Sequence, residues 1–207
     1  MHDVSGSDKA YDQGVPKLWK DTVEAHRRDV RAAIVDAAWT LAQERGVRGV
    51  TMGLVAENAG ISRATLYKYF PGIEEILLAA HEDHVARHLA ALAAARTNAA
   101  SPQEALIAML SGYARICFHR DRAANAEIHG IVHAGRQHAR NQSAVHDLFG
   151  QAMRDAQAVA QVRSDMGAKE LAAFSVSALD AAATASNEPD LERLVRLVAE
   201  ALHLAGR

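Results

Sequence analysis

Arginine, tyrosine and lysine side chains recur at helical spacing just before Pro71. Arg63 and Tyr67 are four residues apart, as are Ala64 and Lys68, so each pair shares one side of a helix. The Arg63 guanidinium can donate two hydrogen bonds to a guanine edge, and the small Ala64 permits close approach to bases. The cationic Lys68 and the Tyr67 hydroxyl suit phosphate oxygens. This segment therefore has the chemistry of a helix that enters the major groove of DNA.

Further polar residues near this segment are predicted to hold the DNA. Thr65 can reach a phosphate or a thymine methyl group, and Tyr69 can reach a phosphate. Thr51 begins a second short helix, whose amino end offers backbone N–H groups to another phosphate. Arg28 and Arg31 lie upstream and can touch the backbone or an adjacent minor groove. The predicted DNA-contacting residues are Thr51, Ser62, Arg63, Ala64, Thr65, Tyr67, Lys68, Tyr69, Arg28 and Arg31.

Apolar residues on the opposite side of the segment predict how it is held. Leu66 and Phe70 are separated by four residues and point inward, where they can pack on Leu54, Val55 and Ile61. Two short helices separated by a glycine turn have the organisation of a helix-turn-helix. The expected helices are residues 18/22–45, 52–59 and 62–70, with Thr51 and Ser62 as N-caps and Gly46, Gly60 and Pro71 at the ends.

The stretch IVDAAWTLAQERGVRGVTMGLVAENAGISRATLYKYFPGIEEILLAA resembles the N-terminal domain of TetR-family regulators throughout. The hallmark part is AGISRATLYKYFPGIEEIL, and the lead-in LWKDTVEAHRRDVRAAIVDAA is similar to members with an extended first helix. Two positions depart from the family pattern. Ile73 stands where a lysine is common, which removes one phosphate contact. Gly53 stands where a polar helix former is common, and should weaken its helix by up to about 1 kcal/mol relative to alanine.

The resemblance implies an all-α protein, with a helix-turn-helix domain followed by a helical domain for effector binding and dimerisation. We expect a disordered tail over residues 1–16, the DNA-binding domain over 17–72 and the second domain over 73–207. Ser101-Pro102-Gln103-Glu104 is a capping box that opens one of its helices. The helices expected after the first domain are residues 73–96, 102–118, 124–134, 142–161, 168–186 and 189–205.

The family also implies a homodimer, which we place at the last two helices. Two such pairs would form a four-helix bundle across a two-fold axis, presenting two recognition helices to a near-palindromic operator. The alternative is that these helices only complete the core of one chain. The candidate interface residues are Leu171, Phe174, Ala178, Leu179, Leu194, Leu197, Val198, Ala201 and Leu202.

The effector pocket implied by the family should be mostly apolar with a few polar groups. A small, largely apolar ligand bound there would release a repressor from its operator by shifting the dimer between two separations of its recognition helices. Each residue taken singly is equally well explained as ordinary core. The candidate ligand-binding residues are Met109, Tyr113, Cys117, Ile128, Val132, Phe149, Met153 and Phe174.

Composition agrees with a DNA-binding module joined to a second domain. The net charge is −2, but residues 17–73 hold nine Lys or Arg against six Asp or Glu, whereas residues 74–207 hold 13 against 16. A lone cysteine, Cys117, excludes a disulfide within the chain and fits a reducing cytoplasm. No run of about 18 apolar residues appears, so no membrane span is expected.

Eleven histidines leave two alternatives open. His81, His84 and His88 share one side of a helix, so a metal-sensing regulator is one, and a helical metal-dependent enzyme is the other. No repeated Glu-x-x-His pair, nucleophile elbow or phosphate-binding glycine loop is present. We therefore expect no enzyme activity, no cofactor and no bound metal. A helical adaptor without affinity for DNA is a further alternative.

Overall fold

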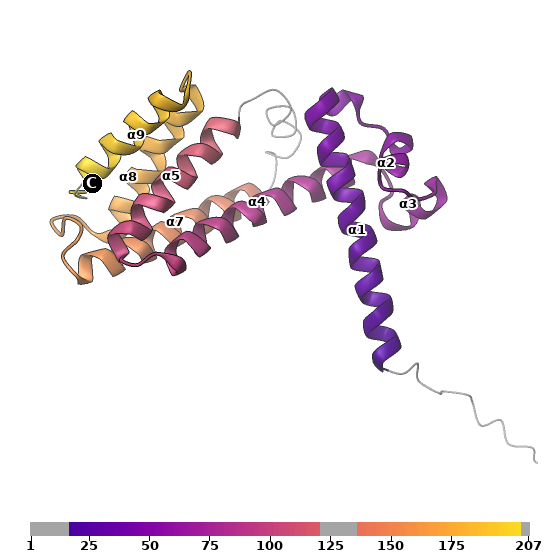
Figure 1. The fold of residues 1–207 in the computed structure, drawn as a ribbon, viewed down its shortest axis with the longest axis horizontal. Coiled ribbons are helices and arrows are strands. Elements are labelled where there is room, and N and C mark those ends of the chain that lie inside the picture. The colour runs from indigo at the N-terminus through magenta and orange to yellow at the C-terminus, as the bar shows by residue number, and fades with distance from the viewer. Residues whose placement is uncertain (1–16, 121–135, 204–207) are drawn as a thin grey trace, which may run out of the picture.

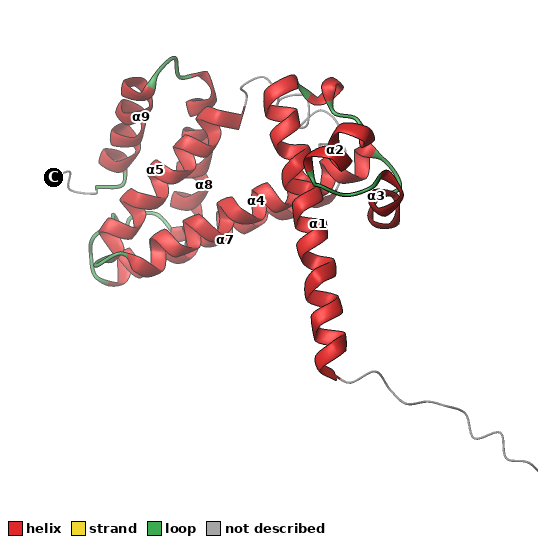
Figure 2. Ribbon diagram, turned by 45° about the vertical axis from the view of Figure 1, so that its right-hand side comes forward, coloured by secondary structure: helices red, strands yellow, loops and turns green. Residues whose placement is uncertain are grey.

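The computed structural model describes residues 17–120 and 136–203, and within them every regular element is a helix. Figures 1 and 2 show two helical bundles, with one long helix, α4, running from the first into the second. The predicted helix over residues 124–134 lies outside the described residues. The N-terminal bundle consists of α1 (Lys17–Arg45), the 3-10 turn η1 (Val47–Gly49), α2 (Met52–Asn58) and α3 (Arg63–Tyr69).

The C-terminal bundle is built on the helices that follow α3 in the chain. Its elements are α4 (Ile73–Asn98), α5 (Pro102–Arg120), α7 (Arg136–Ala158), α8 (Ala168–Asp180), the 3-10 turn η2 (Ala181–Thr184) and α9 (Glu188–Ala201). The expected helix over residues 168–186 is thus shorter, because its last turn tightens into η2. None of the helices in the described ranges is long and apolar enough to cross a membrane.

The N-terminal core forms around the buried side of α1. Ile34 and Leu41 of α1 pack with Val55 of α2, Leu66 of α3 and Ile76 of α4, all with no exposed surface. The first two turns of α4 therefore contribute to this core, although α4 is one continuous helix across the boundary predicted at residues 72 and 73. The boundary itself stays a prediction. The C-terminal core is separate and centres on α5, with Leu106, Met109 and Leu110 fully buried among α7, α8 and α9.

Two glycines set the turns of the N-terminal bundle. Gly60 has φ 67°, and two backbone hydrogen bonds close the end of α2. The Gly60 N–H donates to the Glu57 carbonyl at 3.1 Å, and the Ile61 N–H donates to the Ala56 carbonyl at 3.0 Å. This is the Schellman arrangement that favours glycine. Gly46 has φ 71° but ψ 163°, so it does not take the left-handed helical conformation expected of it. It adopts instead an extended conformation with positive φ, which is essentially restricted to glycine.

Candidate nucleic-acid interface

Two hydroxyl side chains fix the short helices of the candidate interface. Thr51 accepts a hydrogen bond from the Leu54 N–H at 3.4 Å, and Ser62 accepts one from the Thr65 N–H at 3.0 Å. Both predicted N-caps are therefore confirmed. The Ser62 and Thr65 hydroxyls also form a hydrogen bond of 2.9 Å, in which either can be the donor. This cap satisfies one of the amide groups at the start of α3 that have no partner inside the helix.

Helix α3 has one buried side and one exposed side. Leu66 is fully buried and Phe70 nearly so, while Arg63, Tyr67 and Lys68 are exposed, Tyr67 by 56%. The other predicted contact residues on and beside α3 are exposed or half-buried. Ser62 and Ala64 are exposed, and Thr65 and Tyr69 are half-buried. A helix held by an apolar side, with a cationic and hydroxyl-bearing side toward solvent, can present that second side to a DNA groove.

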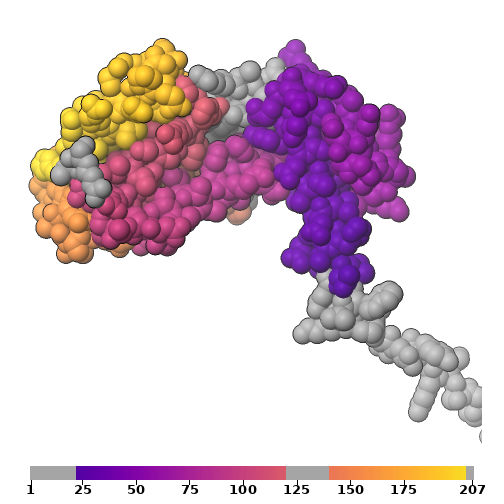
Figure 3. Space-filling model, in the orientation of Figure 1, coloured from indigo at the N-terminus to yellow at the C-terminus, as the bar shows by residue number. Residues whose placement is uncertain are grey.

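The amino-terminal half of α1 projects beyond the bundle beside α3. Figures 1 and 3 show this indigo segment extending well past α2 and α3. Arg31 is exposed, and its guanidinium lies 5.2 Å from the centre of the Phe70 ring, which ties the base of the projecting segment to the end of α3. One turn earlier, the exposed Arg28 donates to the backbone carbonyl of Glu24 at 3.4 Å. Arg31 therefore lies at the end of α3, and Arg28 lies one turn further along the projecting segment.

A contact between α2 and α3 was not predicted from the sequence. The Arg63 guanidinium lies against Gly53, so closely that a Cβ atom on Gly53 would stand 2.6 Å from Nη2. The sequence signal was the unusual glycine, but its spacing of ten residues from Arg63 falls outside any helical periodicity. The contact depends on how α2 crosses α3.

The three candidate metal-binding histidines lie where α1 meets α4. The His84 ring stacks on Trp39 with centres 4.2 Å apart, and His88 approaches His84 edge-on at 4.1 Å. Within residues 17–120 and 136–203, no group of three His, Cys, Asp or Glu side chains has the geometry to hold a metal ion. The structure therefore does not bring His81, His84 and His88 together as the metal site considered from their spacing, and the His84 ring is stacked on an indole.

Burial of the His84 and His88 rings lowers the pKa of both. Desolvation, reinforced by the neighbouring His88, Arg87 and His81, lowers the pKa of His84 from 6.5 to about 4. Desolvation and Arg87 also lower the pKa of His88. Arg87 in turn pairs with Asp36 of α1 at 3.1 Å. The junction between α1 and α4 is thus an aromatic stack beside an exposed ion pair.

The predicted ligand-binding residues do not all share one location. Met109, Tyr113, Cys117, Phe149 and Met153 are buried together in the C-terminal core. Ile128 and Val132 lie outside the described residues. Phe174 is 45% exposed, because the buried side of α8 carries Leu171, Ala172, Ser175, Val176 and Leu179 instead. Phe174 therefore lies on the outer surface of α8 and does not line an interior cavity with the other five.

A polar cluster lies within the buried group. The Tyr113 hydroxyl donates to the Asp180 carboxylate at 3.2 Å, and the Cys117 thiol lies 3.6 Å from the same oxygen. Burial raises the pKa of Tyr113, with Cys117 and Asp180 acting in the same direction. The Tyr113 ring also meets Phe149 edge-on, with centres 5.8 Å apart. The buried group therefore holds a few polar atoms, bonded to one another, among apolar side chains.

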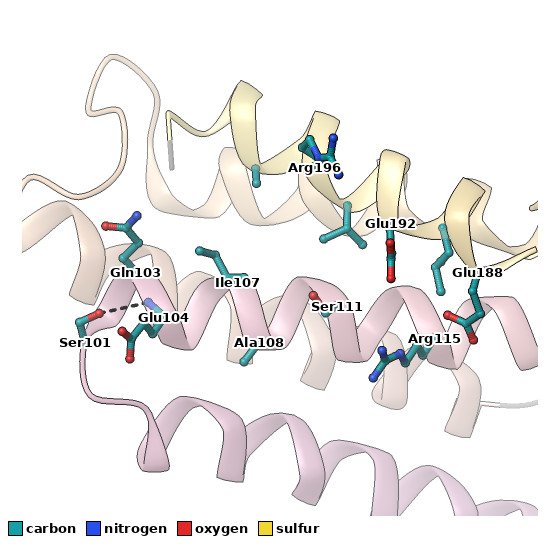
Figure 4. A pocket seen from close by; sticks show the side chains of 13 residues that line it. Ser101, Gln103, Glu104, Ile107, Ala108, Ser111, Arg115, Glu188, Glu192 and Arg196 are labelled. Atoms are coloured by element: carbon teal, nitrogen blue, oxygen red, sulfur yellow. Dashed lines mark hydrogen bonds between the residues drawn. The ribbon is translucent and has the colours of Figure 1, made fainter. Parts of the chain in front are cut away.

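A groove of about 720 Å³ lies on another side of α5, against α9. Figure 4 shows side chains of both helices lining it, with Arg115 and Glu188 toward one end and Gln103 toward the other. Ile107, Leu191 and Val195 give it an apolar floor. None of the predicted ligand-binding residues lines this groove. Sequence reasoning missed it because the lining residues on α5 and α9 belong to two separate helical patterns.

Comparison with known proteins agrees with this architecture. Residues 34–80 match the family model of bacterial regulatory proteins of the tetR family. The chain is 33% identical over 94 residues to the HTH-type transcriptional regulator BetI of Rhizobium meliloti, covering 45% of this chain and 44% of that protein. The chain thus matches less than half the length of this curated relative.

Two solved structures share the fold over most of the chain. A TetR/AcrR-family regulator from Thermobifida fusca is 18% identical, with a TM-score of 0.68 over 82% of this chain and 96% of its own. AibR, solved with isovaleryl coenzyme A and operator DNA, is 19% identical, with a TM-score of 0.57 over 85% of this chain and 100% of its own. At these identities the likeness concerns the fold.

The architecture and the match to residues 34–80 together define an all-helical regulatory protein with an N-terminal helix-turn-helix. Residues 34–80 thus match the model of the tetR family of bacterial regulatory proteins, and the chain as a whole shares the fold of a TetR/AcrR-family regulator.

Proposed function

We propose that this protein is a DNA-binding transcriptional repressor that leaves a near-palindromic operator when a small, largely apolar ligand binds. The observation that carries the proposal is the exposed side of α3. Arg63, Tyr67 and Lys68 point to solvent there, while Leu66 anchors the helix in the core. A plain structural helix would have no need of a cationic side held in this way. Action on DNA would place the protein in the cytoplasm.

The exposed residues are assigned separate roles. Arg63 reads a guanine through bidentate hydrogen bonds, with Ala64 permitting the close approach. Lys68 and the Tyr67 hydroxyl bind phosphate oxygens and fix the position of α3 without reading sequence. Arg31 and Arg28 neutralise phosphates beside the half-site. Thr51, Ser62, Thr65 and Tyr69 contribute further contacts, within the limits set by their capping bonds and partial burial.

The proposed dimer uses the exposed apolar residues of α8 and α9. Leu197 is 63% exposed and Phe174 is 45% exposed, so both apolar side chains are available to a second copy of the chain. Four of the other candidates, Leu171, Leu179, Val198 and Leu202, are buried within their own chain. The proposed interface therefore uses fewer residues than the sequence predicted, and Ala178, Leu194 and Ala201 are half-buried within one chain.

For the effector, we propose the interior site around Tyr113, Cys117 and Asp180. A largely apolar ligand could replace core contacts of Met109, Phe149 and Met153 and take one hydrogen bond from the polar cluster. The fold shared with AibR, which was solved with both a ligand and operator DNA, supports a ligand-responsive role. The groove between α5 and α9 is the competing position.

Salt-dependent binding to duplex DNA tests the proposed function. An operator selected from a random duplex pool should bind with an affinity that falls as salt rises, because phosphate neutralisation releases counterions. Lys68→Ala should weaken binding to every duplex alike and reduce the salt slope by about 1. Lys169→Ala, on the exposed surface of α8, is the matched control and should change neither. If Lys68→Ala leaves both affinity and slope unchanged, α3 is not the DNA-binding element.

The effector site is tested by screening small apolar compounds for release of the DNA complex. Two variants separate the candidate positions. Tyr113→Phe removes the interior hydroxyl and should impair the response to a compound that uses the polar cluster. Ser111→Trp obstructs the groove and should leave that response intact. If Ser111→Trp impaired the response and Tyr113→Phe did not, the effector would bind in the groove. If no compound released the DNA complex, the result would contradict control by a ligand.

A further inference from the structure

Gly53 and Arg63 form a contact that the proposed roles leave unexplained. A Cβ atom at position 53 would lie 2.6 Å from Nη2, 3.2 Å from Cζ and 3.3 Å from Nε of Arg63. All three nearest atoms therefore belong to one guanidinium group, which rests on the bare backbone of α2. Separations below 3.0 Å are not tolerated by real Cβ atoms. The arginine can occupy this position only because residue 53 has no side chain.

The backbone gives no other reason for a glycine at this position. Gly46 and Gly60 have positive φ angles, and Gly53 does not. A half-exposed position in the first turn of α2 would be more stable with almost any other residue, since glycine is a poor helix former. The glycine thus lowers helix stability at a place where the chain conformation does not require it. What it provides is space for Arg63.

The guanidinium receives no polar anchor in the part of the chain that the structure describes. No hydrogen bond or ion pair of Arg63 is found there, and the neighbour that the structure shows for its guanidinium is the α2 backbone at Gly53. Arginine side chains carry large rotamer entropy, and bidentate recognition of guanine requires the planar fork in one orientation. A surface that restricts the side chain before DNA arrives reduces the entropy lost on binding.

We propose that Gly53 is a positioning residue for sequence recognition, which admits the Arg63 guanidinium against α2 and so determines which base pair it reads. This inference rests on the proposed function. A methyl group at position 53 would meet the far end of a flexible side chain, so the guanidinium would swing away and the helices would keep their places. Gly53→Ala should therefore change recognition without disrupting the fold.

The test compares four proteins, namely the original chain, Gly53→Ala, Arg63→Ala and the double variant. Each is measured against the selected operator and against duplexes altered at single base pairs. Arg63→Ala should lose preference at one base pair, by roughly 5- to 100-fold. Gly53→Ala should lose much of the preference at that same base pair, and the double variant should lose no more than Arg63→Ala. Asn58→Ala, exposed on α2, should leave the preference intact.

A second measurement reports on the contact without DNA. In protein labelled with ¹⁵N-arginine, the Nε–Hε resonance of Arg63, identified by its loss in Arg63→Ala, should shift in Gly53→Ala. An unshifted resonance, or an unchanged base preference in Gly53→Ala, would overturn the inference. It would also be overturned if Gly53→Ala lowered the affinity of the Arg63→Ala protein as much as it lowers the affinity of the original chain. Failure of every protein to bind any duplex would instead overturn the proposed function, and the inference with it.

Discussion

At the scale of single residues, Ser62 combines a structural task with a proposed contact to DNA. Its hydroxyl accepts the Thr65 N–H at 3.0 Å and so caps α3, yet the side chain is exposed next to Arg63. An N-cap contributes typically about 1 kcal/mol to stability. The two tasks can be separated because capping requires an acceptor, whereas contact with a phosphate requires a donor.

We expect Ser62→Ala to lower the free energy of unfolding by about 1 kcal/mol and to weaken DNA binding. Ser62→Asp keeps a good capping acceptor, so its stability should match that of the original chain, but its charge should repel phosphates and weaken binding further. Urea denaturation and DNA titration measure the two effects. Equal DNA affinity in Ser62→Asp and the original chain would show that Ser62 lies away from the backbone of DNA.

At the scale of elements, the packing of α1 against α4 connects the DNA-binding bundle to the rest of the molecule. Trp39 and His84 stack across the two helices, and Asp36 pairs with Arg87 beside them. The exposed ion pair contributes little, since pairs in water are typically worth about 0–1 kcal/mol. The aromatic stack buries ring surface between the two helices, and this burial disfavours the charged form of His84.

From this junction we predict that the free energy of unfolding decreases as the pH is lowered from 6.5 toward 4. The pKa of His84 is about 4 in the folded chain and 6.5 without its surroundings, so the unfolded state takes up protons first. The stabilisation that comes from burying a neutral His84 is fully present above pH 6.5, and it is lost as the pH falls toward 4. The lowered pKa of His88 acts in the same direction.

His84→Phe keeps a ring against Trp39 but removes the titration. Its free energy of unfolding, measured in urea between pH 7 and pH 4.5, should fall less steeply than that of the original chain. His26→Phe changes an exposed histidine elsewhere on α1 and serves as the control. Parallel curves for His84→Phe and the original chain would mean that this stack is not what couples stability to pH.

At the scale of the whole molecule, a near-palindromic operator requires two copies of α3 at a fixed separation. The proposed dimer supplies this through the exposed residues Leu197 and Phe174. The two recognition helices would then occupy half-sites about one turn of DNA apart. Dimerisation should therefore affect binding to a full operator much more than binding to one half-site.

Leu197→Glu places a charge in the proposed interface and should shift the protein toward monomers in sedimentation measurements. Its affinity for the full operator should fall, while its affinity for a single half-site should stay the same. Val23→Glu alters a comparably exposed residue, 59% accessible, on the projecting part of α1, and should leave the oligomeric state unchanged. A dimer that survives Leu197→Glu would place the interface elsewhere.

The sequence by itself determined the local features of this protein. The caps at Thr51 and Ser62, the turn at Gly60 and the two sides of α3 all follow from residues close together in the chain. Hydrogen bonds to the nearest amides and a helical period of 3.6 residues act within a few residues, whatever the rest of the molecule does. The helix-turn-helix could therefore be predicted almost residue by residue.

The tertiary structure alone decided the relations between elements. It placed Arg63 on Gly53, turned His84 toward Trp39, left Phe174 on the surface and opened a groove between α5 and α9. Each depends on which helix packs against which, and at what angle. An apolar pattern shows that a helix has a side to bury, but the partner is chosen by the packing of side chains distant in sequence.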